Sequence, residues 1–168
     1  MTEIDEERLL RSFQYYRHRF RYKRHFGQVT WLLLAFSKWW QVTGETHFAD
    51  MTFEIADWLL SYQNKTGGFI NDHQPGTPGY TTAVYLEGIA AALSIAGGDR
   101  RETYLDSCAR GFRFLDQLII QERDRSILPN PDYAIGGLRQ SLHYSEIRAD
   151  FVQHSLSATL EFSHELHG

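Results

Sequence analysis

The sequence has little cysteine, no long apolar run and no excess of positive charge. Cys108 is the single cysteine in 168 residues, which excludes an internal disulfide framework. No stretch approaches the roughly 18 apolar residues of a membrane span, and the acidic N-terminus lacks the basic and then apolar order of a signal peptide. A formal net charge of −4 argues against nucleic acid as a partner. We therefore expect a cytoplasmic protein that neither enters a membrane nor binds nucleic acid.

Aromatic residues are abundant. They make up 14% of the chain, within an otherwise ordinary 42% of apolar and 23% of charged residues. A chain of this length buries roughly two thirds of its unfolded surface as one domain. We therefore expect residues 1–168 to form a single domain whose aromatic side chains fill a large core or line a cavity.

Apolar residues recur at helical spacing along almost the whole chain, with almost no strand signal. The expected fold class is all-α, with about six helices. They cover about residues 6–23, 29–42, 46–62, 82–96, 101–121 and 147–166. Gly27 is expected to interrupt the chain after the first helix, and Gly97 and Gly98 to end the fourth.

The helices after the first alternate in character. The second is apolar nearly all round, the fourth is rich in alanine and glycine, and the sixth is also expected on the inside. The third and fifth are amphipathic, as outer helices are. We therefore distinguish an N-terminal basic and aromatic helix, residues 1–26, from a set of helical hairpins over residues 28–166.

Two diglycine segments mark a repeat. Gly67-Gly68 and Gly136-Gly137 lie 69 residues apart, each after an amphipathic segment and each before a long loop that leads into an inner helix. The opposite turns, around residues 43–45 and 97–99, are short. Long loops on one face and short turns on the other predict a functional rim at the N-terminal ends of the inner helices.

The segment Gln-Asn-Lys-Thr-Gly-Gly-Phe at 63–69, followed by Thr-Thr-Ala-Val-Tyr-Leu-Glu-Gly at 81–88, resembles the α/α-toroid superfamily. It looks like the repeat of six-hairpin glycosidases and sugar epimerases, and it is similar to the Gly-Gly-Phe repeats of terpenoid cyclases and protein prenyltransferases. The resemblance implies an α/α toroid whose active face lies at the N-terminal ends of the inner helices. A complete toroid has about twelve helices, so about six imply a half barrel.

Three residues are candidates for catalysis. Superposing residues 83–93 on 150–160 places Glu87 opposite His154, so polar groups recur at one place in two apolar helices. Glu87 is a candidate general acid or base, His154 a proton-transfer residue, and Asp150 the second carboxylate that glycoside chemistry needs. The alternatives are a structural Glu87 bound to backbone or Arg148, an Asp150 that complements the helix dipole, and a core histidine.

The candidate substrate-binding residues lie on or beside the predicted rim. Tyr80 follows a Pro-Gly pair and is the best candidate for a sugar-stacking ring. The full set is Asp72, His73, Tyr80, Tyr85, His143, Tyr144 and Arg148. Asp72, His73 and His143 match no metal-ligand spacing, so no metal and no cofactor is expected.

Three functions stay open. The first is a carbohydrate-active domain, glycoside hydrolase or sugar epimerase-like, that acts on a small-molecule or glycan substrate by acid and base chemistry. The second is a non-catalytic helical module, or the C-terminal half of a larger toroid, completed by a missing N-terminal half or by a homodimer. The third is an isoprenoid or terpenoid cyclase-like protein, which the missing Asp-x-Asp-Asp element disfavours.

Overall fold

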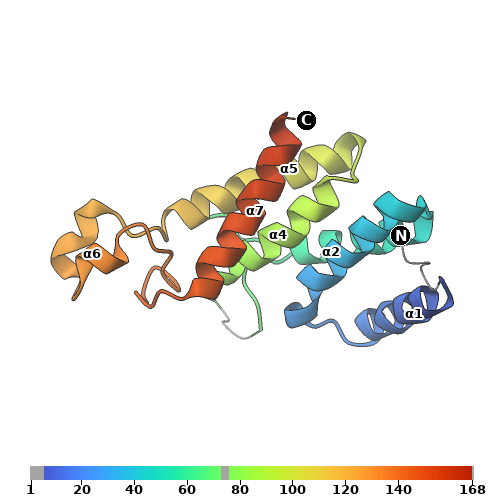
Figure 1. Cartoon of the computed structure of the whole chain (residues 1–168), viewed down its shortest axis with the longest axis horizontal. Coiled ribbons are helices and arrows are strands. Elements are labelled where there is room, and N and C mark those ends of the chain that lie inside the picture. Colours follow the sequence, from blue (N-terminus) through green and yellow to red (C-terminus); the bar gives the residue numbers. More distant parts are fainter. Residues whose placement is uncertain (1–5, 73–75, 168) are drawn as a thin grey trace.

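The computed structural model describes residues 6–72 and 76–167. Within these ranges the chain is helical, and strand pairing is limited to isolated bridges (Figure 1). The elements are α1 (Glu6–Tyr22), α2 (Phe26–Thr43), α3 (Thr46–Leu60), α4 (Thr81–Leu93), α5 (Gly98–Asp116), the 3-10 helix η1 (Glu122–Ile127), α6 (Pro131–Ala134) and α7 (Ala149–His167). The prediction of an all-α chain is confirmed.

The six expected helices are present with small shifts at their ends. Gly27 was expected to interrupt the chain, but it lies in the first turn of α2, where the His25 ring caps the helix by accepting a hydrogen bond from the Gly27 N–H at 3.2 Å. Gly98 was expected to end the fourth helix, and instead it begins α5 at φ +55°. The short helices η1 and α6 were not expected, because four to six residues carry too little periodicity to be recognised.

The helices α2, α4 and α7 form one row with α4 at its centre, as Figure 1 shows. The amphipathic α3 packs against α2 and α4, and α5 packs against α4. Small residues make the close approach possible. A Cβ atom on Gly88 would lie 3.2 Å from the Cα atom of Thr30, and one on Gly111 would lie 2.6 Å from a methyl carbon of Leu86. The expected succession of helical hairpins is therefore present, as a row of α2, α4 and α7 with α3 and α5 packed against it.

The helix α1 is fixed to this array by aromatic and charged contacts. The buried Phe13 ring lies 5.2 Å from the Phe36 ring and 5.0 Å from the Phe48 ring, measured between centroids. The Arg21 guanidinium is paired with the Glu54 carboxylate of α3. Arg21, one of the basic residues of this helix, therefore helps to hold α1 against its neighbours.

The two diglycine loops lie together on one side of the row. Each turns back on itself through an isolated bridge, Gln63 with Phe69 and Ile119 with Leu138. The loops also pair with each other, since the Tyr80 N–H donates to the Gln140 carbonyl at 2.8 Å. These two loops precede α4 and α7, so both inner helices begin at the same face.

The lengths and side chains of the helices bear on whether any of them can span a membrane. None of those in the described ranges is both long and apolar enough to cross a bilayer.

Candidate functional site

A carboxylate and an imidazole meet between the two inner helices that follow the diglycine loops. The Oε2 atom of Glu87 in α4 lies 2.7 Å from the Nδ1 atom of His154 in α7. The exposed fraction of the side chain is 9% for Glu87 and 12% for His154. This distance is that of a strong hydrogen bond, and at this burial little water competes for either group.

The packing of α7 on α4 explains why these two residues meet. Phe151, His154 and Ala158 follow one another at helical spacing, and Phe151 and Ala158 are buried. His154 therefore lies on the packed face of α7. On α4, Glu87 stands in an unbroken buried run, where an isolated charge would be costly. The partner that offsets this cost is His154. Arg148, which the sequence offered as an alternative partner of Glu87, is paired with Asp150 instead.

A tryptophan from the third inner helix completes the surroundings of His154. The Trp31 ring of α2 lies 6.0 Å from the His154 ring, with an angle of 63° between the two planes. Trp31 is 57% exposed, although the apolar character of its helix suggested a core position. The two rings therefore meet in an edge-to-face contact, while much of the indole stays open to solvent.

Beside this pair is a pocket of about 360 Å³ between α2, the start of α4 and the loop before α4. Its hydrogen-bonding side chains are those of Thr30, Asn71, Thr81, Tyr80 and Tyr85, and Trp31 forms part of its wall. Neither Glu87 nor His154 lines the pocket, and Trp31, whose ring contacts that of His154, is the residue that links the two. Of the predicted substrate-binding residues, the structure brings Tyr80 and Tyr85 together here.

Burial and hydrogen bonds hold this pocket in shape. The Asn71 amide donates to the Thr81 hydroxyl at 3.2 Å, and the Thr30 hydroxyl donates to the Val84 carbonyl at 2.7 Å. Burial raises the pKa of Tyr85 to about 12, while a hydrogen bond with Asn71 acts in the opposite direction. The Tyr85 hydroxyl therefore stays protonated at neutral pH and can donate a hydrogen bond.

The remaining predicted acid, Asp150, lies in a second cluster at the start of α7. The Arg148 Nε and Nη2 atoms donate to the two Asp150 carboxylate oxygens at 2.9 and 3.1 Å. The hydrogen bonds that Arg148 donates to Asp150 raise the pKa of Arg148. The Arg148 guanidinium also lies 5.2 Å from the centroid of the Phe151 ring, on which the Tyr80 ring stacks at 3.7 Å. Tyr80 thus connects this cluster to the pocket.

The other predicted residues are more dispersed. Asp72 is exposed, and its charge contributes to the raised pKa of Tyr85. His143 and Tyr144 are exposed on the loop before α7. His73 lies outside the described residues. No group of three or more histidine, cysteine, aspartate or glutamate side chains suited to a metal ion occurs in the described ranges.

The pocket also contains Trp31, Asn71 and Thr81, which are not among the predicted substrate-binding residues. Asn71 and Thr81 flank the Pro-Gly segment, and polar residues at both ends of a predicted rim loop were the available signal. No such signal marks Trp31 as part of a site, because the residues around it on its helix are apolar.

Comparisons with known proteins identify no relative of this chain. No family model matches it, and neither the curated proteins nor the solved structures contain a significant match.

Proposed function

We propose that this protein is an acid and base catalyst of sugar chemistry in which His154 transfers a proton and Glu87 orients it. The observation that supports this is the 2.7 Å contact between Glu87 Oε2 and His154 Nδ1. A carboxylate on one ring nitrogen fixes the tautomer and orientation of the imidazole and stabilises its protonated form. The other nitrogen, Nε2, is then the one that meets a substrate.

The chemistry of the neighbouring pocket favours a carbohydrate. A sugar has many hydroxyl groups and apolar C–H faces, so it needs hydrogen-bonding groups together with aromatic rings. The pocket offers hydroxyls from Tyr80, Tyr85 and Thr81, the Asn71 amide and the face of Trp31. Its volume of about 360 Å³ suits one or two sugar rings.

The pairing of the carboxylates favours proton transfer over glycoside hydrolysis. Hydrolysis uses two carboxyl groups on either side of the scissile bond, separated by about 5–9.5 Å. Here Glu87 is bonded to His154, and Asp150 is held by Arg148. In the proposed reaction, His154 Nε2 removes a proton from a carbon next to a carbonyl, and the electron pair forms an enediolate. Return of a proton to the other face or to the adjacent carbon completes an epimerisation or isomerisation without net oxidation.

Proton NMR in D₂O tests this proposal on a panel of aldoses, ketoses and N-acetylated hexosamines. We expect deuterium to replace the proton next to the carbonyl of one of them. His154→Gln and Glu87→Gln should each lower that rate by at least about a hundredfold, the usual scale of acid and base catalysis. Unchanged exchange in both variants would contradict the proposal.

Asp150→Asn separates the two reaction types. If the Glu87–His154 pair acts alone, this variant keeps a rate within about threefold of the wild type. A loss as large as that of Glu87→Gln would indicate instead a two-carboxylate mechanism of the glycosidase kind.

A second candidate is a helical module completed by another copy of the same chain. Val152, Leu156 and Leu160, at a spacing of four on the outer face of α7, are 42%, 57% and 62% exposed. Residues 151–160 contain no aspartate, glutamate, lysine or arginine, so two copies of this face would not repel each other. In an antiparallel pair of α7 helices, Leu156 would lie near the two-fold axis.

Light scattering coupled to size-exclusion chromatography tests this second candidate. The wild type should have twice the mass of one chain, and Leu156→Glu should have the mass of one chain. Tyr133→Glu serves as the control, because Tyr133 is 93% exposed on α6, away from α7 (Figure 1). A monomeric, folded wild type would exclude the pairing.

A further inference from the structure

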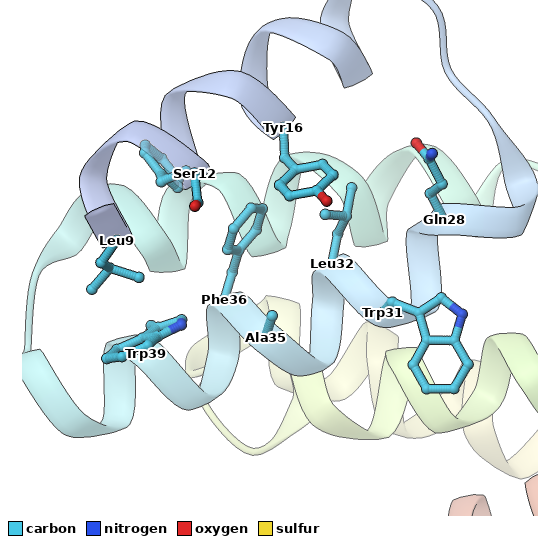
Figure 2. A pocket seen from close by; sticks show the side chains of 10 residues that line it. Leu9, Ser12, Tyr16, Gln28, Trp31, Leu32, Ala35, Phe36 and Trp39 are labelled. Carbon is cyan, nitrogen blue, oxygen red and sulfur yellow. The ribbon is translucent and has the colours of Figure 1, made fainter. Parts of the chain in front are cut away.

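A separate groove runs between α1 and α2, on the side of α2 that faces α1. Its volume is about 370 Å³, within the range of small-molecule sites. Figure 2 shows the side chains of Leu9, Ser12 and Tyr16 on the α1 side, and those of Trp31, Ala35 and Trp39 on the α2 side. Neither Glu87 nor His154 lines it, and among the described residues Trp31 is the one that lines both this groove and the pocket beside His154.

The spacing of residues on α2 explains why space remains here. Trp31, Ala35 and Trp39 follow one another every four residues and so lie along one face of the helix. The methyl group of Ala35 stands between two indole rings and leaves a gap that a larger side chain would fill. On the other side, Phe13 is committed to the core through its contacts with Phe36 and Phe48, which holds α1 in place without closing the groove.

Three polar groups lie along this otherwise apolar surface. They are the Ser12 hydroxyl, the Tyr16 hydroxyl and the Gln28 amide (Figure 2). Within residues 6–72 and 76–167, none of these three side chains makes a hydrogen bond to another protein group. They are therefore available to a ligand, and together they offer both donors and acceptors.

The charge of the lining restricts the kind of ligand. Among residues 6–72 and 76–167, all the side chains that line the groove are uncharged, even though α1 carries several arginines. An anionic or cationic head group placed among these aromatic and aliphatic side chains would lose its hydration without gaining an ion pair. A neutral ligand avoids this cost.

We propose that the groove between α1 and α2 binds a neutral amphiphile, a molecule with an aliphatic or aromatic body and a hydroxyl or carbonyl group. The body lies against Trp31, Trp39 and Leu32, and the polar group exchanges hydrogen bonds with Tyr16 or Gln28. A pocket of apolar walls with a few polar groups that fix orientation is the usual form of such a site.

Fluorescence provides a direct test, with N-phenyl-1-naphthylamine as a neutral apolar probe and 1-decanol as its competitor. The probe should gain fluorescence on binding, and 1-decanol should displace it at lower concentration than decanoate or decyl phosphate. Ala35→Trp fills the gap between the indole rings and should weaken probe binding at least tenfold. Circular dichroism confirms that this variant is folded.

Two neighbouring tyrosines supply a matched pair for the polar contact. Tyr16→Phe should weaken the binding of 1-decanol about three- to tenfold, the scale of one hydrogen bond. It should leave the binding of the probe unchanged. Tyr15→Phe is the control, since Tyr15 is 58% exposed and does not line the groove.

Three results would overturn this inference. They are tighter binding of decanoate or decyl phosphate than of 1-decanol, undiminished probe binding by folded Ala35→Trp, and equal effects of Tyr16→Phe and Tyr15→Phe. The first would assign a charged ligand class, and the other two would place the probe elsewhere on the protein.

Discussion

The Nδ1 atom of His154 lies 2.7 Å from the Oε2 atom of Glu87, across 67 positions of sequence. This contact joins the middle of α4 to α7, the two inner helices that follow the diglycine loops. It satisfies a carboxylate that stands in a buried run of α4, and it leaves the second nitrogen of the imidazole for other partners.

The Glu87–His154 contact should be measurable as a coupling free energy. Each of Glu87→Ala and His154→Ala leaves a polar group with little access to water, so each should cost about 1–3 kcal/mol of unfolding free energy. The double variant should cost less than the sum, with a coupling of about 1–3 kcal/mol. Urea unfolding of the four proteins measures this, and strictly additive losses would show that the two side chains do not interact in solution.

The glycines at corresponding places in the two loops should differ in their tolerance of a side chain. Gly67 and Gly136 both have a positive φ, +94° and +86°, so alanine is strained at either. A Cβ atom on Gly67 would also lie 2.1 Å from the Arg110 carbonyl oxygen of α5, whereas one on Gly136 meets nothing within 4 Å. We expect Gly136→Ala to cost about 1–2 kcal/mol and Gly67→Ala more than about 3 kcal/mol.

Thermal or urea unfolding of these two variants measures the difference. Equal losses would mean that the first loop does not pack on α5 as described.

The ion pair between Arg21 and Glu54 should stabilise the protein in a pH-dependent way. The hydrogen bonds from Arg21 lower the pKa of the Glu54 carboxyl below its ordinary value. The pair is partly exposed, so Arg21→Gln should cost only about 0.5–1 kcal/mol at neutral pH. The pKa of Glu54 is lower in the folded protein than in the unfolded chain, where it has the ordinary glutamate pKa of about 4.3. The stabilisation is therefore complete at pH values above the unfolded-state pKa, and it declines as the pH falls through the folded-state pKa.

Urea unfolding from pH 7 to pH 3 measures this dependence. The control is Arg11→Gln, which removes a pair with Glu7 whose side chains are 66% and 80% exposed, and it should have no measurable effect. A loss in Arg21→Gln that grew as the pH fell would contradict the assignment.

The thiol of Cys108 should be inert in the folded protein. Cys108 is fully buried in α5, and burial raises its pKa to about 12. Since the thiolate is the reactive form, a disulfide reagent at pH 8 should react only when the protein unfolds. In 8 M urea the same reagent should react within seconds to minutes. Ser126→Cys adds an exposed thiol as a positive control, and rapid loss of two thiols from that folded variant would contradict the burial of Cys108.

The long helices could be predicted because helical periodicity is a local property. Segments such as 46–62 and 82–96 carry enough repeats of the apolar pattern, and their observed ends differ from the expected ones by a few residues. The four residues of α6 and the six of η1 do not carry such a pattern. Their positions depend on the Pro131 turn and on contacts of the Gln121 and Asp124 side chains with backbone.

The site could be predicted only in part. The internal repeat places Glu87 and His154 at equivalent positions, which indicated that they lie at the same level of the array. The repeat did not predict which side chain pairs with each carboxylate, because that pairing depends on how far α7 is rotated about its axis. That rotation brings His154 to Glu87 and leaves Arg148 with Asp150.

The sequence by itself determined the long helices, their succession as hairpins and the common face of the two diglycine loops. These follow from periodicity, glycine placement and the succession of hairpins, which are encoded within each segment. Only the tertiary structure decided that Trp31 is exposed beside His154, that Glu87 pairs with His154, and that α1 and α2 enclose a groove with uncharged walls. Each of these depends on the angle and distance between packed helices, which no single segment of the chain encodes.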